Sequence, residues 1–189
     1  MDSLYTSVML HQDCTCKCGS YWYSSSLLNV LHVASDGLLR QNLQDAVKSC
    51  CFEDTQVHLT CDCGSTTQLK SISLADTGPF LIISFKRAQP GNTRSITQVN
   101  TDLVICIAKL EYRRVAVVLH HGDSTDSGQY TCLVEDDVWL HCDDSRVTII
   151  NDVDEFLTAN DRCVVLWLYA RQESPVIVTR SLSMSQMDK

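Results

Sequence analysis

The stretch that decides the fold is HHGDSTDSGQYTCLVEDDVWLHCDDS, at residues 120–145. It contains a His-x-Gly turn at 120–122, a Ser-Gly-x-Tyr turn at 127–130, and a Trp ahead of a paired Asp at 139–145. From Gln129 onward, β-branched, aromatic and polar residues predict two strands, at 129–135 and 138–142. The polar loop 122–128 precedes them. The sequence therefore predicts two consecutive strands with several polar groups close to one end.

Further strands and two short helices are predicted before and after this pair of strands. We expect strands at 27–33, 56–61, 67–74, 80–85, 103–108, 111–120 and 163–169, and helices at 38–49 and 152–157. The strands at 103–108 and 111–120 should pair as a hairpin. The other segments are a lead-in at 1–12, a break at Asp36-Gly37, a turn at 76–79 and a loop at 88–95. Runs of antiparallel strands with two short helices indicate an α+β fold. We expect one domain over residues 1–171 and a polar, disordered tail at 172–189.

Composition narrows the class of protein. The chain has 189 residues, of which 44% are hydrophobic and 20% charged, and this favours one globular domain. A net charge of −8 argues against nucleic-acid binding, which needs clustered basic residues. No segment approaches the ~20 apolar residues of a membrane span, so we expect no membrane association. Eleven cysteines, an odd number, without a recognisable signal peptide favour a reducing compartment, the cytoplasm or the nucleus.

Two cysteine knuckles, at 14–19 and 61–64, each end in Cys-Gly. Four converging thiolates with glycine-assisted turns are what a structural zinc ribbon requires. The sequence predicts a Zn²⁺ site made of Cys16, Cys18, Cys61 and Cys63. Cys14 is an alternative ligand, and a metal-free remnant of a ribbon is the competing interpretation. We expect the other cysteines to fill gaps in the core: Cys50, Cys51, Cys106, Cys132, Cys142 and Cys163.

A competing interpretation concerns Asp126-Ser127-Gly128-Gln129-Tyr130-Thr131-Cys132, which matches the tyrosine-corner strand of an immunoglobulin domain. Under it, Cys61 and Cys132 form the inter-sheet disulfide of a secreted binding module. Two observations weigh against it. No Trp lies between the two cysteines to pack on the bridge, and a helix and a further strand are expected after Cys132.

The order of these features resembles the ubiquitin-specific proteases, a family of cysteine peptidases with a papain-like fold. The correspondence runs from the two knuckles through the Lys86-Arg87 strand end and the hairpin to the closing strand at 164–169. It implies zinc-ribbon fingers and a mainly antiparallel palm. The family's nucleophile lies in an Asn-x-Gly-Asn-x-Cys-Tyr segment of a thumb region. No such segment occurs here, and we therefore expect fingers and palm without the thumb.

The resemblance also assigns roles to residues. Asp143 matches the catalytic acid, Asp144 a helper near the oxyanion, and Gln129 stands at the family's catalytic His. The implied partner is ubiquitin or a ubiquitinated protein. The residues expected to bind its C-terminal tail are His121, Gly122, Gly128 and Tyr130.

Gln129 decides how the resemblance translates into activity. A cysteine nucleophile needs an imidazole to take its proton and to protonate the leaving amine, and a carboxamide does neither. We therefore expect an inactive, deubiquitinase-like pseudoenzyme that binds ubiquitin. The alternative is a deubiquitinating peptidase completed by another chain or segment, with His121 facing Gln129 as a substitute base. We expect Cys132 and Cys142, beside the site, to be packed thiols rather than nucleophiles.

Overall fold

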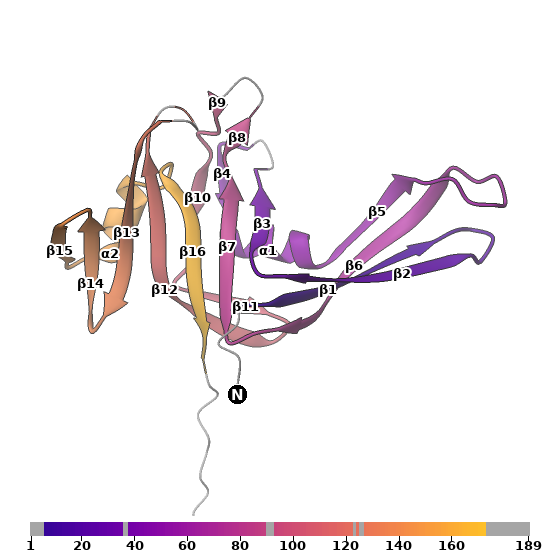
Figure 1. Ribbon diagram of the computed structural model, residues 1–189, viewed down its shortest axis with the longest axis horizontal. Coiled ribbons are helices and arrows are strands. Elements are labelled where there is room, and N and C mark those ends of the chain that lie inside the picture. Colours follow the sequence, from indigo (N-terminus) through magenta and orange to yellow (C-terminus); the bar gives the residue numbers. More distant parts are fainter. Residues whose placement is uncertain (1–5, 36–37, 90–92, 123, 125–126, 173–189) are drawn as a thin grey trace, which may run out of the picture.

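A computed structural model describes residues 6–35, 38–89, 93–122, 124 and 127–172. The described chain forms two main sheets and two short two-stranded pairs (Figure 1). A large mixed sheet, the palm, carries both helices, and a narrower ribbon of long strands, the fingers, projects from its side. None of the helices in these ranges is long and apolar enough to cross a membrane.

The palm is an eight-stranded sheet in the order β15-β14-β13-β12-β16-β7-β3, with β11 also paired to β12. Its strands are β3 (Leu31–Ala34), β7 (Phe80–Lys86), β11 (Val104–Ile107), β12 (Leu110–His121), β13 (Gln129–Asp136), β14 (Val138–Asp143), β15 (Arg146–Ile150) and β16 (Val164–Arg171). Only β3 runs parallel to its neighbour among these described strands. The two strands predicted at 129–135 and 138–142 correspond to β13 and β14, which form a hairpin near one edge.

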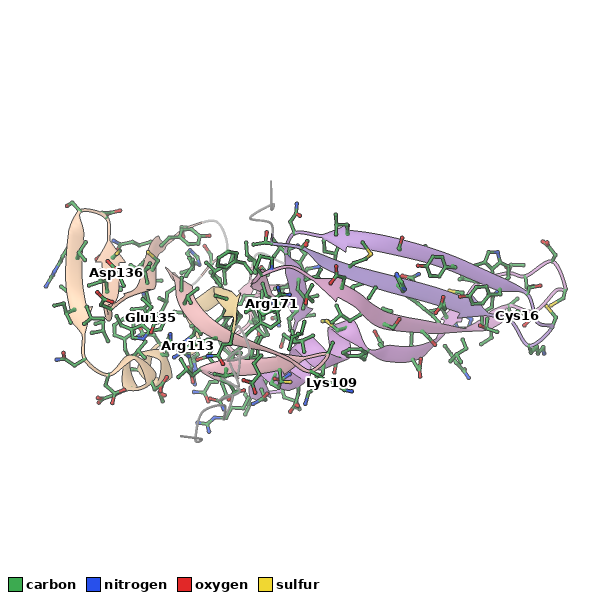
Figure 2. All side chains as sticks on the ribbon, turned by 90° about the horizontal axis from the view of Figure 1, so that it is seen from below. Cys16, Lys109, Arg113, Glu135, Asp136 and Arg171 are labelled. Atoms are coloured by element: carbon green, nitrogen blue, oxygen red, sulfur yellow. The ribbon has the colours of Figure 1, made fainter. Side chains whose placement is uncertain are left out.

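The fingers are a four-stranded antiparallel sheet in the order β2-β1-β6-β5. Their strands are β1 (Val8–Thr15), β2 (Tyr21–Leu28), β5 (Glu53–His58) and β6 (Thr67–Thr77). Cys16 lies at the far tip of this sheet, as Figure 2 shows. Two short pairs complete the strands: β4 (Arg40–Asn42) with β10 (Gln98–Asn100), and β8 (Ala88–Gln89) with β9 (Thr93–Arg94).

Both helices begin at a side-chain cap. Asn42 accepts a hydrogen bond from the Asp45 amide at the start of α1 (Leu43–Cys51), and Asp152 does the same for Glu155 at α2 (Val153–Ala159). Such caps satisfy amides that the first helical turn leaves unpaired.

The apolar core lies in the palm. It gathers side chains mainly from the strands between β3 and β13 and from both helices. Trp167 is fully buried in it and meets Phe85 edge-on at 6.4 Å between ring centroids. α1 contributes Leu43, Ala46, Val47 and Cys51. The core therefore holds the palm strands in place and leaves most of the fingers outside it.

Several sequence expectations are confirmed and others are wrong. The β11–β12 hairpin, the turn before β7 and the strands β13 and β14 are present. The lead-in is wrong from Val8 onward, since β1 begins there, and the strand expected at 27–33 divides between β2 and β3. The first helix begins at Leu43, because 40–42 pair with β10 instead. β15 was not expected. Asp36-Gly37 and the tail at 173–189 lie outside the described residues.

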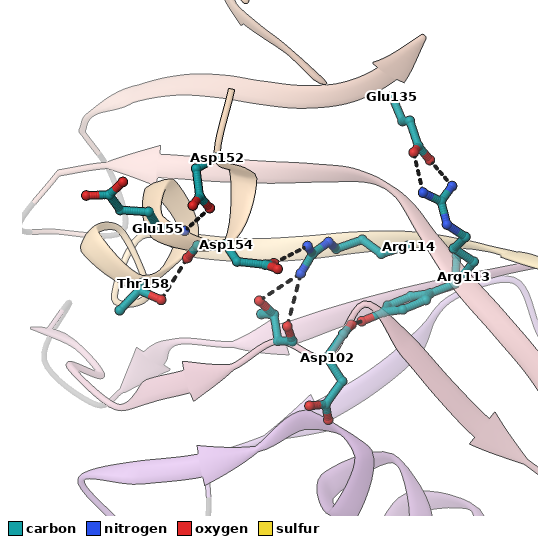
Figure 3. A network of polar contacts seen from close by, with 10 residues as sticks. Asp102, Arg113, Arg114, Glu135, Asp152, Asp154, Glu155 and Thr158 are labelled. Carbon is teal, nitrogen blue, oxygen red and sulfur yellow. Dashed lines mark hydrogen bonds and ion pairs between the residues drawn. The ribbon is translucent and has the colours of Figure 1, made fainter. Parts of the chain in front are cut away.

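Two adjacent arginines of β12 point to opposite faces of the sheet (Figure 3). Arg114 is fully buried, donates to Thr101 O at 3.0 Å and to Asp154 Oδ1 at 2.8 Å, and lies 5.5 Å from the Trp139 ring centroid. Arg114 therefore joins the loop before β11 and helix α2 to the palm sheet. Arg113 forms an ion pair with Glu135 on the other face, with its side chain 39% exposed.

The adjacent arginines provide a matched test of this link. We expect Arg114→Ala to lower the free energy of unfolding by about 3 kcal/mol, because it removes a buried, multiply bonded cation and leaves a cavity. Arg113→Ala should cost below about 1 kcal/mol, because its ion pair is partly solvated. Urea denaturation of the two variants measures both values, and equal losses would contradict the assignment of Arg114 as the internal anchor.

Candidate functional site

The ends of β12, β13 and β14 meet at one side of the palm, which we call the hairpin edge. Most of the site residues predicted from the sequence lie there. His121 and Gln129 are register partners across β12 and β13, and Gln129 Nε2 donates a hydrogen bond to Asp143 Oδ1 at the end of β14. Asp144 begins the two-residue turn into β15 with a φ of 50°. This left-handed conformation suits Asp in tight hairpin turns. Asp143 thus contacts Gln129, whereas Asp144 shapes the turn.

At the hairpin edge, the backbone at Gly122 lies close to the backbone at Ser127 and Gly128, and Gly128 lies against His120. We call this place the mouth of the hairpin edge. A Cβ on Gly122 would lie 2.3 Å from Ser127 O and 3.0 Å from Gly128 Cα. A Cβ on Gly128, whose φ is +152°, would lie 2.3 Å from His120 Nε2. No other residue type fits these two positions without displacing the backbone or His120.

The two histidines at the end of β12 have different surroundings. His120 is 5% exposed and stacks on Tyr130, with the ring centroids 4.6 Å apart. His121 Nε2 lies 3.0 Å from Thr131 Oγ1, within hydrogen-bonding distance. Tyr130 itself is 61% exposed. The packing role of His120 was missed from the sequence, where only the His-x-Gly pattern hinted at it.

The four cysteines of the two knuckles converge at the tip of the fingers. Their sulfur atoms all lie within 4.8 Å of one another. Cys16 and Cys63 have their sulfurs 3.7 Å apart, and Cys18 and Cys61 have theirs 3.6 Å apart. A tetrahedral Zn²⁺ with Zn–S bonds of about 2.3 Å requires sulfurs about 3.8 Å apart. The predicted set of four ligands therefore has the geometry of a structural zinc site.

The same local turn builds both knuckles. In the first, the Gly19 amide donates to Cys16 O and the Cys16 amide donates to Ser20 O, both at 2.9 Å. The equivalent pair of bonds recurs over 61–65. Gly19 and Gly64 have φ values of 91° and 83°, a region that favours glycine. The Cys-Gly repeat in the sequence is thus the signature of this turn.

The sulfurs influence one another's protonation. Hydrogen bonding with the side chain and backbone of Ser20, and then with Cys63 and Cys16, lowers the pKa of Cys18 to about 6. The Ser65 backbone lowers the pKa of Cys63, but its contacts with Cys18, Cys61 and Cys16 outweigh this and raise it to about 12. The Cys18 thiol thus loses its proton more readily than the Cys63 thiol. A divalent cation would replace these protons.

Other cysteine expectations are mixed. Cys14 as an alternative ligand is wrong, because it is buried within β1 and is not one of the four clustered cysteines. Cys51 is a core residue, whereas Cys106 is exposed and fills no gap. Cys50, Cys132, Cys142 and Cys163 are half-buried.

The immunoglobulin interpretation is wrong. Cys61 belongs to the four-cysteine cluster of the fingers, and Cys132 lies in the palm sheet opposite Cys142. Tyr130 points outward and stacks on His120 instead of forming a buried corner. The Tyr-x-Cys pattern is therefore a coincidence of strand alternation.

A mainly antiparallel palm with cysteine-tipped fingers defines the fold class of the ubiquitin-specific cysteine peptidases. The family model described as ubiquitin carboxyl-terminal hydrolase matches residues 6–169, and the chain belongs to this family. Among solved structures, a chain from the structure of yeast SAGA DUBm is similar, with a TM-score of 0.76 and 16% sequence identity. The match covers 89% of this chain and 41% of that one. No curated protein matches the chain.

The cysteine cluster predicts one tightly bound zinc ion per molecule. We expect Cys61→Ser to abolish stoichiometric zinc binding, because three thiolates hold the ion far more weakly than four. The control Cys106→Ser, at an exposed palm position, should leave the zinc content unchanged. Atomic absorption on dialysed protein measures the ratio, and zinc at equal stoichiometry in both variants would contradict the assignment.

Proposed function

We propose that this chain is a ubiquitin-binding module of its family that does not hydrolyse isopeptide bonds by itself. The proposal rests on the contact between Gln129 and Asp143. In the family, an imidazole takes the position of Gln129 and the carboxylate orients it. Here the Asp143 carboxylate accepts a hydrogen bond from the residue at this position, but that residue carries a carboxamide. The edge therefore keeps its shape without a base.

The missing base has a quantitative meaning for catalysis. A cysteine thiol has a pKa of about 8.5 and becomes a strong nucleophile when a neighbouring imidazole accepts its proton. The same imidazole then returns a proton to the departing amine, and general acid–base transfer of this kind contributes on the order of 10²–10⁴-fold. The side chain of Gln129 does not titrate near neutral pH. It supports neither step.

His121 is the candidate for a substitute base. It faces Gln129 across the ladder, which supports the alternative function of a peptidase completed by another chain or segment. Its Nε2, however, is within hydrogen-bonding distance of Thr131 Oγ1, on β13. The ring would have to leave this contact to reach a nucleophile. This favours a structural role for His121, and we keep catalysis as the second candidate.

Exposed aromatic groups support binding of a protein partner. Tyr130 is 61% exposed beside the glycine-lined mouth, and Tyr21, Trp22 and Tyr23 of β2 are 58%, 44% and 53% exposed on the fingers. Aromatic side chains are over-represented at the centre of protein interfaces. The net charge of −8 suits a partner with a basic C-terminal tail, such as ubiquitin. We place this activity in the cytoplasm or nucleus, because eleven cysteines, an odd number, suit a reducing compartment.

The pseudoenzyme proposal predicts binding without reaction. The chain should bind unmodified ubiquitin, and it should not become labelled by ubiquitin carrying a thiol-reactive group at its C-terminus. We expect Gln129→His to remain inactive too, because the 189 residues hold no Asn-x-Gly-Asn-x-Cys-Tyr segment. Turnover of a ubiquitin-amide substrate by the wild-type chain would support the peptidase alternative and overturn the proposal.

The exposed position of Tyr130 beside Gly128 predicts that it contributes to ubiquitin binding. We expect Tyr130→Ala to weaken ubiquitin binding on the order of tenfold, as loss of an interface aromatic typically does. Val138→Ala is the control, since this residue is 45% exposed at the opposite end of the hairpin. Isothermal titration calorimetry compares them. Equal affinities would remove Tyr130 from the interface, and failure of the wild-type chain to bind would refute ubiquitin binding itself.

A further inference from the structure

Two cysteines that the proposed function does not use face each other in the palm. Cys132 of β13 and Cys142 of β14 are direct register partners, and theirs is the last pair of the ladder before Gln129 and Asp143. We propose that these two thiols form a reversible disulfide across the hairpin, a redox site separate from the four-cysteine cluster. This inference stands independently of ubiquitin binding.

The strand register already supplies most of the required geometry. Directly opposite residues of an antiparallel pair have Cα atoms about 4.5–5.5 Å apart, within the range of about 4.4–6.8 Å seen for disulfides. Their Cβ atoms lie about 4.5–5.5 Å apart, and a disulfide brings them to about 3.5–4.5 Å. Closing the bond therefore takes a local adjustment on the order of 1 Å. The strands need not separate.

The pairing is specific to these two residues. In the register of the described strands, no other two cysteines face each other. On either side of the pair stand Val118 and Val147, which offer no competing polar group. Burial and then the neighbouring Cys142 raise the pKa of the Cys132 thiol, which is consistent with two sulfurs in contact. Both side chains are half-buried, so a small oxidant can reach them.

The chemistry balances with a peroxide as oxidant. One thiolate attacks a peroxide oxygen, the O–O bond breaks, and a sulfenic acid and water form. The second thiolate then attacks the sulfenic sulfur, the S–S bond forms, and a second water leaves. In sum the two thiols lose two electrons and two protons, and hydrogen peroxide becomes two waters. An external dithiol reverses the reaction through a mixed disulfide.

The location gives the crosslink a structural consequence. Cys142 directly precedes Asp143, and Cys132 lies three positions after Gln129. A covalent bond at this pair fixes the end of the β13–β14 ladder from which the Gln129–Asp143 contact extends. Oxidation would therefore stiffen the hairpin edge without touching the residues that form its surface.

Peptide mapping tests the proposal directly. Trypsin cleaves after Arg114 and Arg146, and the peptide 115–146 contains Cys132, Cys142 and no other cysteine. The full-length, zinc-loaded chain is treated with dilute hydrogen peroxide, blocked with iodoacetamide and digested. We expect this peptide to be two hydrogens lighter than its thiol form and to carry no blocking group. Dithiothreitol before blocking should restore two alkylation sites.

Variants separate the disulfide from general thiol oxidation. In Cys132→Ser and Cys142→Ser the remaining thiol should be alkylated or gain oxygen, whereas the exposed-site control Cys106→Ser should form the bond as the wild type does. The proposal is overturned if the wild-type peptide gains oxygen atoms or stays fully alkylated under conditions that oxidise Cys106.

Discussion

The structure depends on strand β12 being paired along both of its edges. β16 takes one edge over residues 112–119, and β11 and then β13 take the other. A strand held in this way cannot rotate or slip, because a shift of one residue would exchange the faces of all its side chains. Arg114 is thereby fixed on the inner face. His120, His121 and Gly122 are likewise fixed at the strand end that meets β13.

This constraint explains why the geometry of the hairpin edge does not depend on whether residue 129 is a base. Backbone pairing places Gln129 opposite His121, and the glycine approach at 122 and 128 depends only on main-chain atoms and His120. Neither requires a base at position 129. A carboxamide offers Asp143 the same kind of N–H donor that an imidazole would, so the carboxylate retains its partner. The geometry of this edge is therefore independent of the basicity of the side chain at position 129.

What the sequence could predict follows from how local each signal is. The two strands of the β13–β14 hairpin and the two knuckles are each encoded by neighbouring residues, and the sequence predicts all of them. β4 pairs with β10, 58 positions away, and this distant partner replaces the helical start expected at residue 38. β2 is exposed on almost its whole length, so its Tyr-Trp-Tyr-Ser-Ser-Ser run shows no period that marks a strand. The approach of Gly128 to His120 likewise needs the folded backbone.

The two parts of the molecule are stabilised by different means. Beyond Val8, whose side chain joins the core, the described finger strands place none of their buried residues in the apolar core. The buried side chains there are few and include Cys14, Cys16, Cys61 and Gln68. A thin ribbon buries too little apolar surface to offset the entropy of ordering its chain. The convergence of four thiolates at its tip supplies the missing free energy once a cation binds, and the fingers should therefore order with the metal while the palm orders with its core.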